Sequence, residues 1–147
     1  MLPQGYTIRK LELGDYEPYV ETLRVLTTVG DIPLDKFKDV FAHWEKLSDT
    51  YMPRVITNEN GIVVATGMLL VERKIIHECG SVGHIEDISV AKSEQGKGLG
   101  ISMIKELSGV AKEVGCYKVI LDCSPHNVGF YEKCGYKNDG SEMCLRL

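Results

Sequence analysis

A glycine-rich segment in the second half of the chain reads Gln95-Gly96-Lys97-Gly98-Leu99-Gly100. It follows a β-branched run at residues 84–90 that predicts a strand, and it leads into residues 99–114, where apolar side chains recur at helical spacing. Free N–H groups and the helix dipole at such a junction favour a phosphate, and the glycines allow close approach of the backbone. The segment therefore predicts a phosphate site with added charge from Lys97, although it can also be a plain tight connection.

Two other phosphate-binding motifs fit this segment less well. A P-loop needs Lys followed by Ser or Thr after its last glycine, whereas Gly100 is followed by Ile101 and Ser102. A dinucleotide fold expects an acidic residue about 20 positions further on, and Asp122 lies near that distance. The turn comes late in the chain, after a predicted hairpin instead of the first strand, and this position counts against the dinucleotide interpretation.

The first half of the chain predicts strands and helices in alternation. Residues 6–9 predict a short strand, and a helix follows that Asp15 can cap. A second helix begins near Pro33 and carries aromatic residues at helical spacing, more typical of packing than of a ligand site. Residues 54–57 and 62–72, joined by an Asn-Gly turn, predict an antiparallel hairpin.

The second half predicts a crossover around the glycine-rich segment. Gly115 can close the helix from the left-handed region, and residues 118–123 predict a buried strand. A short helix at 127–133 stops at Gly135, and residues 136–147 are expected to form the last strand. This order predicts an α/β fold.

Length and charge limit the classes of function. At 147 residues, the chain is expected to form one domain, residues 1–147. Its 21 acidic and 17 basic side chains give a net charge of -4, which argues against a nucleic-acid partner. No apolar run approaches the ~20 residues that span a bilayer, and no signal-peptide pattern is visible. We expect a cytoplasmic protein without membrane association.

The five cysteines are an odd number at irregular spacings. They form neither a CxxC pair nor a zinc-binding pattern with histidine. We expect reduced, mostly buried thiols and no metal site.

Two motifs together resemble a known superfamily. Gln95-x-x-Gly98-x-Gly100 resembles the pyrophosphate-binding signature of the GCN5-related N-acetyltransferases (GNAT), and residues 127–136 resemble their later motif. The resemblance implies the GNAT fold, a mixed central β-sheet with flanking helices, and acetyl-CoA as cosubstrate. It also implies that the strands on either side of the crossover splay apart, with the pantetheine arm between them.

Five blocks resemble one family within that superfamily, the glucosamine 6-phosphate N-acetyltransferases: residues 26–30, 72–78, 83–88, 116–123 and 127–136. This resemblance implies direct acetylation of D-glucosamine 6-phosphate, a step of UDP-GlcNAc biosynthesis, by a homodimer in which two subunits share each active site and exchange their carboxyl-terminal strands. Two alternatives stay open: a GNAT enzyme acting on another amine, and a non-catalytic acyl-CoA-binding module.

Acetyl transfer to an amine needs a neutral amine, a polarised carbonyl and a proton for the departing thiolate. By resemblance, the catalytic residues are Tyr131, Glu86 and Asp87. A phenol can donate to the thiolate without being charged, although Tyr131 can equally be a core residue. Adjacent strand residues point to opposite faces, so Glu86 and Asp87 reach one site only if a β-bulge intervenes; otherwise they are a solvated acidic pair.

The resemblance also assigns binding residues. Those expected at the cofactor are Ile88, Ser89, Val90, Gln95, Gly96, Lys97, Gly98, Leu99, Gly100, Ile101, Asp122, Asn127 and Tyr131. Those expected at the sugar phosphate are Thr27, Lys74, Ile75, Ile76, His77, Glu86, Asp87, Tyr117, Lys118 and Arg146. Asn127 can instead be a helix cap, and single lysines are often merely solvated.

Overall fold

The computed structural model describes residues 2–147, and of the expected domain only residue 1 lies outside this part. Five strands form one sheet in chain order. They are β1 (Thr7–Lys10), β2 (Tyr51–Thr57), β3 (Val63–Arg73), β4 (Ser81–Val90) and β5 (Cys116–Ile120). Neighbouring strands are antiparallel except β4 and β5, which are parallel. The sheet is therefore mixed, as predicted.

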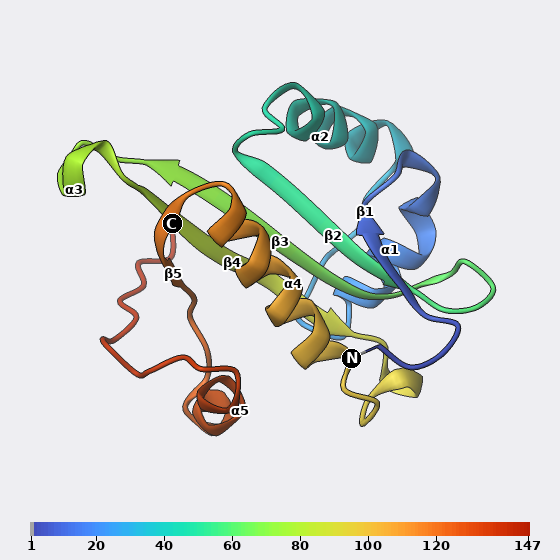
Figure 1. The fold of residues 1–147 in the computed structure, drawn as a ribbon. Helices are drawn as coiled ribbons and strands as arrows, with labels where there is room; N and C mark the ends of the chain where they lie inside the picture. Colours follow the sequence, from blue (N-terminus) through green and yellow to red (C-terminus); the bar gives the residue numbers. More distant parts are fainter. Residues whose placement is uncertain (1) are drawn as a thin grey trace.

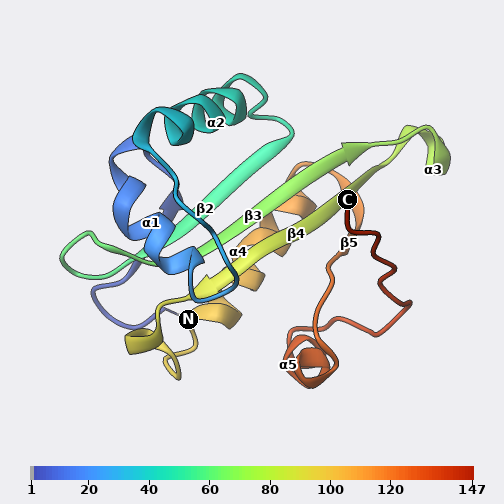
Figure 2. The same ribbon diagram turned by 180° about the vertical axis from the view of Figure 1, so that it is seen from behind.

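Helices cover both faces of this sheet (Figures 1 and 2). One face carries α1 (Tyr16–Leu23) and α2 (Leu34–Lys46), and the other carries α4 (Leu99–Glu113). Short elements complete the chain: α3 (Ile76–Cys79) at the tip between β3 and β4, α5 (Val128–Lys133) beyond β5, and 3-10 turns at Leu13–Asp15, Lys92–Glu94 and Pro125–Asn127. Within residues 2–147, no helix has the length and apolarity needed to cross a membrane.

Each face of the sheet has its own apolar core. The α4 side is built on Leu99, Met103 and Leu107, which are almost wholly buried against β2, β3 and β4. Gly67 of β3 makes this close packing possible, because a Cβ there would lie 2.8 Å from side-chain atoms of both Met103 and Leu107. The opposite face buries Tyr19 and Phe37 against the strands. Close packing thus fixes the position of α4 against the sheet.

The predicted hairpin and crossover are confirmed, with shifted ends. Strand β2 begins at Tyr51, and the turn is held by the Asn58 side chain, which accepts hydrogen bonds from the N–H groups of Asn60 and Ile62, both at 3.0 Å. Gly61 has a positive φ of 75°. Gly115 closes α4 at φ 88°, as expected for a left-handed position.

Several local predictions were wrong. Asp15 does not cap α1; its carboxylate instead accepts two hydrogen bonds from Arg9, at 2.8 and 2.9 Å, and one from the Glu12 N–H. The cysteines are free, as predicted, but none is fully buried, and Cys79 and Cys144 are exposed.

The carboxyl-terminal third departs most from prediction. Strand β5 begins two residues earlier than predicted and ends at Ile120, and its side chains are not buried, because β5 is the edge of the sheet. Residues 136–147 form no strand, which contradicts the predicted last strand. A strand needs a partner for its main-chain groups, and within residues 2–147 this segment pairs with no strand of the sheet.

Candidate active site

Strands β4 and β5 part in the middle of β4. Their last pair joins His84 to Ile120, whereas β4 continues to Val90. Beyond this pair the chain after β5 leaves the sheet toward α5 (Figure 1). The separation matches the splayed strands that the GNAT resemblance implies.

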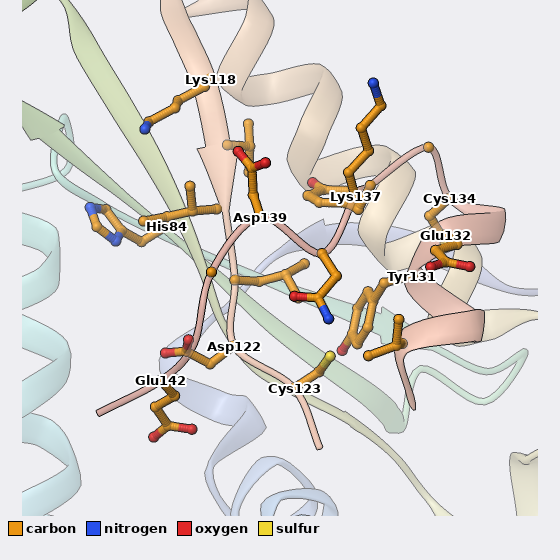
Figure 3. A pocket seen from close by; sticks show the side chains of 18 of the residues that line it. His84, Lys118, Asp122, Cys123, Tyr131, Glu132, Cys134, Lys137, Asp139 and Glu142 are labelled. Atoms are coloured by element: carbon orange, nitrogen blue, oxygen red, sulfur yellow. The ribbon is translucent and has the colours of Figure 1, made fainter. Parts of the chain in front are cut away.

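A cavity of about 990 Å³ lies where the strands separate. It is lined by parts of β4 and β5, the loop after β5, α5 and residues 134–142. Four of the predicted site residues meet in it: Glu86, Lys118, Asp122 and Tyr131. Figure 3 shows three of these side chains: Lys118 comes from β5, Asp122 from the loop after β5, and Tyr131 from α5. Side chains of both charges therefore surround one cavity.

The expected β-bulge is present at the acidic pair. Thr66 pairs with Ser89 and Met68 with Glu86, so Asp87 and Ile88 together oppose the single residue Gly67. Asp87 adopts a positive φ of 55°, unusual for a residue other than glycine. The bulge removes the strict alternation of β4 at this point. Of the acidic pair, Glu86 lines the cavity and Asp87 does not.

Burial and nearby charges raise the pKa values of the acidic pair. Burial raises the pKa of Glu86, and the negative charges of Asp87 and Asp122 raise it further. Burial also raises the pKa of Asp87. A carboxylate with a raised pKa accepts a proton more readily, so Glu86 and Asp87 are better suited than ordinary surface carboxylates to hold or accept an amine proton.

Tyr131, in contrast to the acidic pair, is suited to donate a proton. It contacts Phe130 and Tyr136 edge-on, with ring centroids 5.0 and 6.4 Å away. Burial raises the pKa of its hydroxyl, and the nearby thiols of Cys123 and Cys134 add to the effect. In Figure 3 the hydroxyl end of Tyr131 points toward Cys123. Tyr131 is therefore both a packed residue and a protonated hydroxyl at the cavity.

The glycine-rich segment forms an open cradle before α4. Gly96 and Gly98 have φ values of 85° and 78°, and added Cβ atoms would meet nothing within 4 Å. The first helical hydrogen bond runs from the Ser102 N–H to the Gly98 carbonyl at 3.1 Å, so the three N–H groups at residues 99–101 lie at the free amino end. This geometry fits a phosphate.

Other predicted residues lie at the tip between β3 and β4. Lys74, Ile75, Ile76 and His77 are there, and the His77 ring lies 4.2 Å from the Tyr117 ring of β5, centroid to centroid. Residues 77–79 all have positive φ, so the tip is a strained left-handed turn. Ile75 and Ile76 keep 85% and 59% of their surface exposed, which leaves an apolar tip uncovered in the single chain.

The remaining predicted residues stay apart from the cavity in one chain. Thr27 is exposed after α1, and Arg146 is exposed in the carboxyl-terminal segment. Asn127 precedes α5, but its side chain makes no capping hydrogen bond, so the cap interpretation is not supported.

His84 is a cavity residue that sequence reasoning missed. Its Nε2 lies 2.9 Å from Oε1 of Glu72, a carboxylate that also accepts a hydrogen bond from Lys74 at 3.1 Å. The signal was available, because His84 lies two residues before Glu86 on the same strand and therefore shares its face.

Comparison with known proteins agrees with this geometry. The acetyltransferase (GNAT) family model matches residues 15–136. Glucosamine 6-phosphate N-acetyltransferase of Candida albicans is 67% identical over 148 residues, which cover 100% of this chain and 99% of the relative. The chain belongs to the glucosamine 6-phosphate N-acetyltransferases of the GNAT family.

More distant members agree in sequence and in structure. The enzyme of that name from Arabidopsis thaliana is 39% identical over 144 residues, 97% of each chain. A crystal structure of glucosamine-6-phosphate N-acetyltransferase from Arabidopsis thaliana superposes with a TM-score of 0.93, covering 96% of this chain and 97% of that one. A Trypanosoma brucei acetyltransferase, 31% identical, superposes at 0.90 over 97% and 99% of the two chains. The mixed sheet with flanking helices is thus the GNAT fold, as predicted.

Proposed function

We propose that this GNAT domain transfers the acetyl group of acetyl-CoA to the amine of D-glucosamine 6-phosphate and forms N-acetyl-D-glucosamine 6-phosphate. The observation that carries the proposal is the cavity at the parting of β4 and β5, lined by Glu86 and Tyr131. Support comes from the Candida albicans relative, which bears the enzyme's name and matches the full length.

Acetyl-CoA binds with its phosphates at the amino end of α4. The open glycines and the free N–H groups there suit an anion. The pantetheine arm then follows β4, at Ile88 to Val90, through the gap between the strands. This path brings the thioester to the cavity beside Tyr131.

Transfer is direct, without an acyl-enzyme. The amine nitrogen attacks the thioester carbonyl carbon, a C–N bond forms, the C–S bond breaks, and the electron pair goes to sulfur. Glu86 and Asp87 orient the amine and hold its released proton, for which their raised pKa values are favourable. The Tyr131 hydroxyl donates to the departing sulfur. Asp122 and Asn127 line the path of the arm and the sugar.

The sugar phosphate is held by cations from two subunits. Lys118 already faces the cavity, and Lys74 and His77 lie at the apolar tip. Met143 and Leu145 are 91% and 83% exposed in the segment that pairs with no strand of the sheet, and the outer edge of β5 is open. Exposed apolar side chains beside an open strand edge favour a second copy of the chain. In the homodimer, the exposed end of this segment, with Met143 and Leu145, crosses to the partner and brings Arg146 to the site.

The proposal also covers the domain, its cellular compartment and the use of its product. Residues 1–147 act as one acetyltransferase domain, and the five free cysteines fit a reducing compartment such as the cytoplasm. The product is consumed in UDP-GlcNAc biosynthesis.

A panel of amines incubated with acetyl-CoA, with release of free thiol as the readout, tests the proposal. Release with glucosamine 6-phosphate, and not with a polyamine or a lysine peptide, is expected. Release with another amine alone would make this a GNAT enzyme of different specificity. Tight binding of acetyl-CoA without transfer to any amine would indicate a binding module instead.

A further inference from the structure

The Lys97 side chain, in the middle of the glycine-rich loop, has two partners within the protein. Its Nζ donates to Oε2 of Glu94 at 2.7 Å and to the hydroxyl oxygen of Tyr6 at 3.1 Å. The Tyr6 hydroxyl in turn donates to the same Glu94 oxygen at 2.5 Å. Three side chains, two of them 91 residues apart in sequence, thus form a closed triangle that we call the loop clamp.

The clamp joins the loop to the rigid part of the fold. Tyr6 directly precedes β1 and packs against the α4 side of the core. In Figures 1 and 2 the chain just before β1 lies beside the loop that leads into α4. Glu94 ends the short 3-10 turn before the loop, and only 14% of its side chain is exposed. The clamp therefore ties a glycine-rich loop to the first strand of the sheet.

The loop needs such support because its own backbone has little. Gly96 and Gly98 have no side chains to pack, and the space around them is open. Glycine backbone is costly in entropy to hold in one conformation. A loop that is ordered before the ligand arrives binds more tightly, because the ordering cost is already met.

We propose that Tyr6 and Glu94 are positioning residues for acetyl-CoA, which hold Lys97 and preorder the loop so that the main-chain N–H groups before α4 face the phosphates. This inference rests on the proposed use of that loop for acetyl-CoA. The positive charge of Lys97 is already balanced by Glu94, so the clamp leaves recognition of the phosphates mainly to the backbone.

An alternative is that the clamp only stabilises the fold. Exposed ion pairs contribute little to stability, and Lys97 is 45% exposed. A stabilising role would lower the melting temperature without changing affinity for the cofactor. A positioning role would change affinity while the melting temperature of the ligand-free protein stays nearly constant.

The test is calorimetry of coenzyme A binding to Tyr6→Phe, which removes one hydroxyl and keeps the ring. The dissociation constant should rise about three- to tenfold, the loss expected for one hydrogen bond. The KM for acetyl-CoA should rise in parallel, with kcat and the KM for glucosamine 6-phosphate unchanged. Tyr16→Phe is the matched control, because its hydroxyl donates to the Ile32 carbonyl far from the loop. It should leave affinity for coenzyme A unchanged.

Glu94→Gln and the double variant complete a cycle that subtracts each variant's separate effect on charge. If both residues act through one clamp, their effects should overlap. The dissociation constant of the double variant for coenzyme A should then rise by less than the product of the two single fold-changes. Additive effects, or unchanged affinity in Tyr6→Phe, would overturn the inference while leaving the proposed function intact. Failure of the unaltered protein to bind coenzyme A would instead refute both.

Discussion

The hydroxyl of Thr66 donates a hydrogen bond of 2.9 Å to the main-chain oxygen of Asp87, across the β-bulge of β4. Thr66 is fully buried, and Asp87 is held at a positive φ that few residues adopt. A buried hydrogen bond thus holds the β-bulge at the acidic pair, of which Glu86 lines the cavity.

Removing this bond should relax the bulge. Thr66→Val keeps the shape but leaves the Asp87 oxygen without its donor, at a cost of about 1–3 kcal/mol in the free energy of unfolding. We expect turnover to fall by more than the loss of folded protein explains, measured as kcat per folded molecule. Thr66→Ser retains a hydroxyl and should keep most of the activity. Equal activity of the Val and Ser variants would show that the bulge does not depend on this bond.

Tyr131→Phe tests the proton donor. The hydroxyl should matter chiefly when charge develops on sulfur, so kcat should fall tenfold or more while both KM values change little. A tenfold loss corresponds to about 1.4 kcal/mol. Tyr136→Phe is the control, because that hydroxyl pairs with Ser108 at 2.7 Å and should affect stability alone. If Tyr131→Phe turned over at the normal rate, Tyr131 would be a packing residue.

The pH dependence of kcat/KM should report the acidic pair. Protonated Glu86 cannot accept the amine proton, so activity rises with pH through its pKa, which lies above that of an ordinary glutamate. Four charged groups act on it: Asp87, Asp122 and Glu142 raise the pKa, and His84 lowers it. Asp122→Asn removes one negative charge and should therefore move the acidic limb of the profile to lower pH. A limb that did not move, or moved upward, would assign it to another group.

Arg146 tests the shared site. Arg146→Ala should raise the KM for glucosamine 6-phosphate and leave that for acetyl-CoA nearly unchanged, because a guanidinium pairs bidentately with phosphate. Unphosphorylated glucosamine should be acetylated equally well by both forms. Mixing Arg146→Ala with Tyr131→Phe subunits should then restore activity above that of either parent, since one of the two sites in a mixed dimer carries neither defect. No recovery despite demonstrated subunit exchange would contradict a site built from two chains.

Much of the fold could be predicted because its signals are local. The spacing of apolar residues located α4, and the Asn-Gly turn located the hairpin, since helix period and turn conformation depend on neighbouring residues alone. A bulge was one of two interpretations of the adjacent acidic residues, because the resemblance assigns both of them to one site. The assignment of roles to Glu86 and Tyr131 came from resemblance of motifs, and the structure brings both residues to one cavity.

Long-range contacts decided the rest. A run of apolar residues suggests a buried strand but does not say which strand forms the edge of a sheet, so β5 was predicted to be buried and is half-exposed. A strand also depends on a partner, which is why residues 136–147 have strand-like composition but no strand in one chain.

The sequence alone was sufficient for the crossover, the glycine-rich turn before α4 and the family, because each is recognised from short segments of the chain. Only folding could reveal that Lys97 is already engaged by Tyr6 and that Thr66 secures the bulge. Each of these contacts joins segments that packing brings together, and no local pattern encodes the direction and distance at which two such side chains meet.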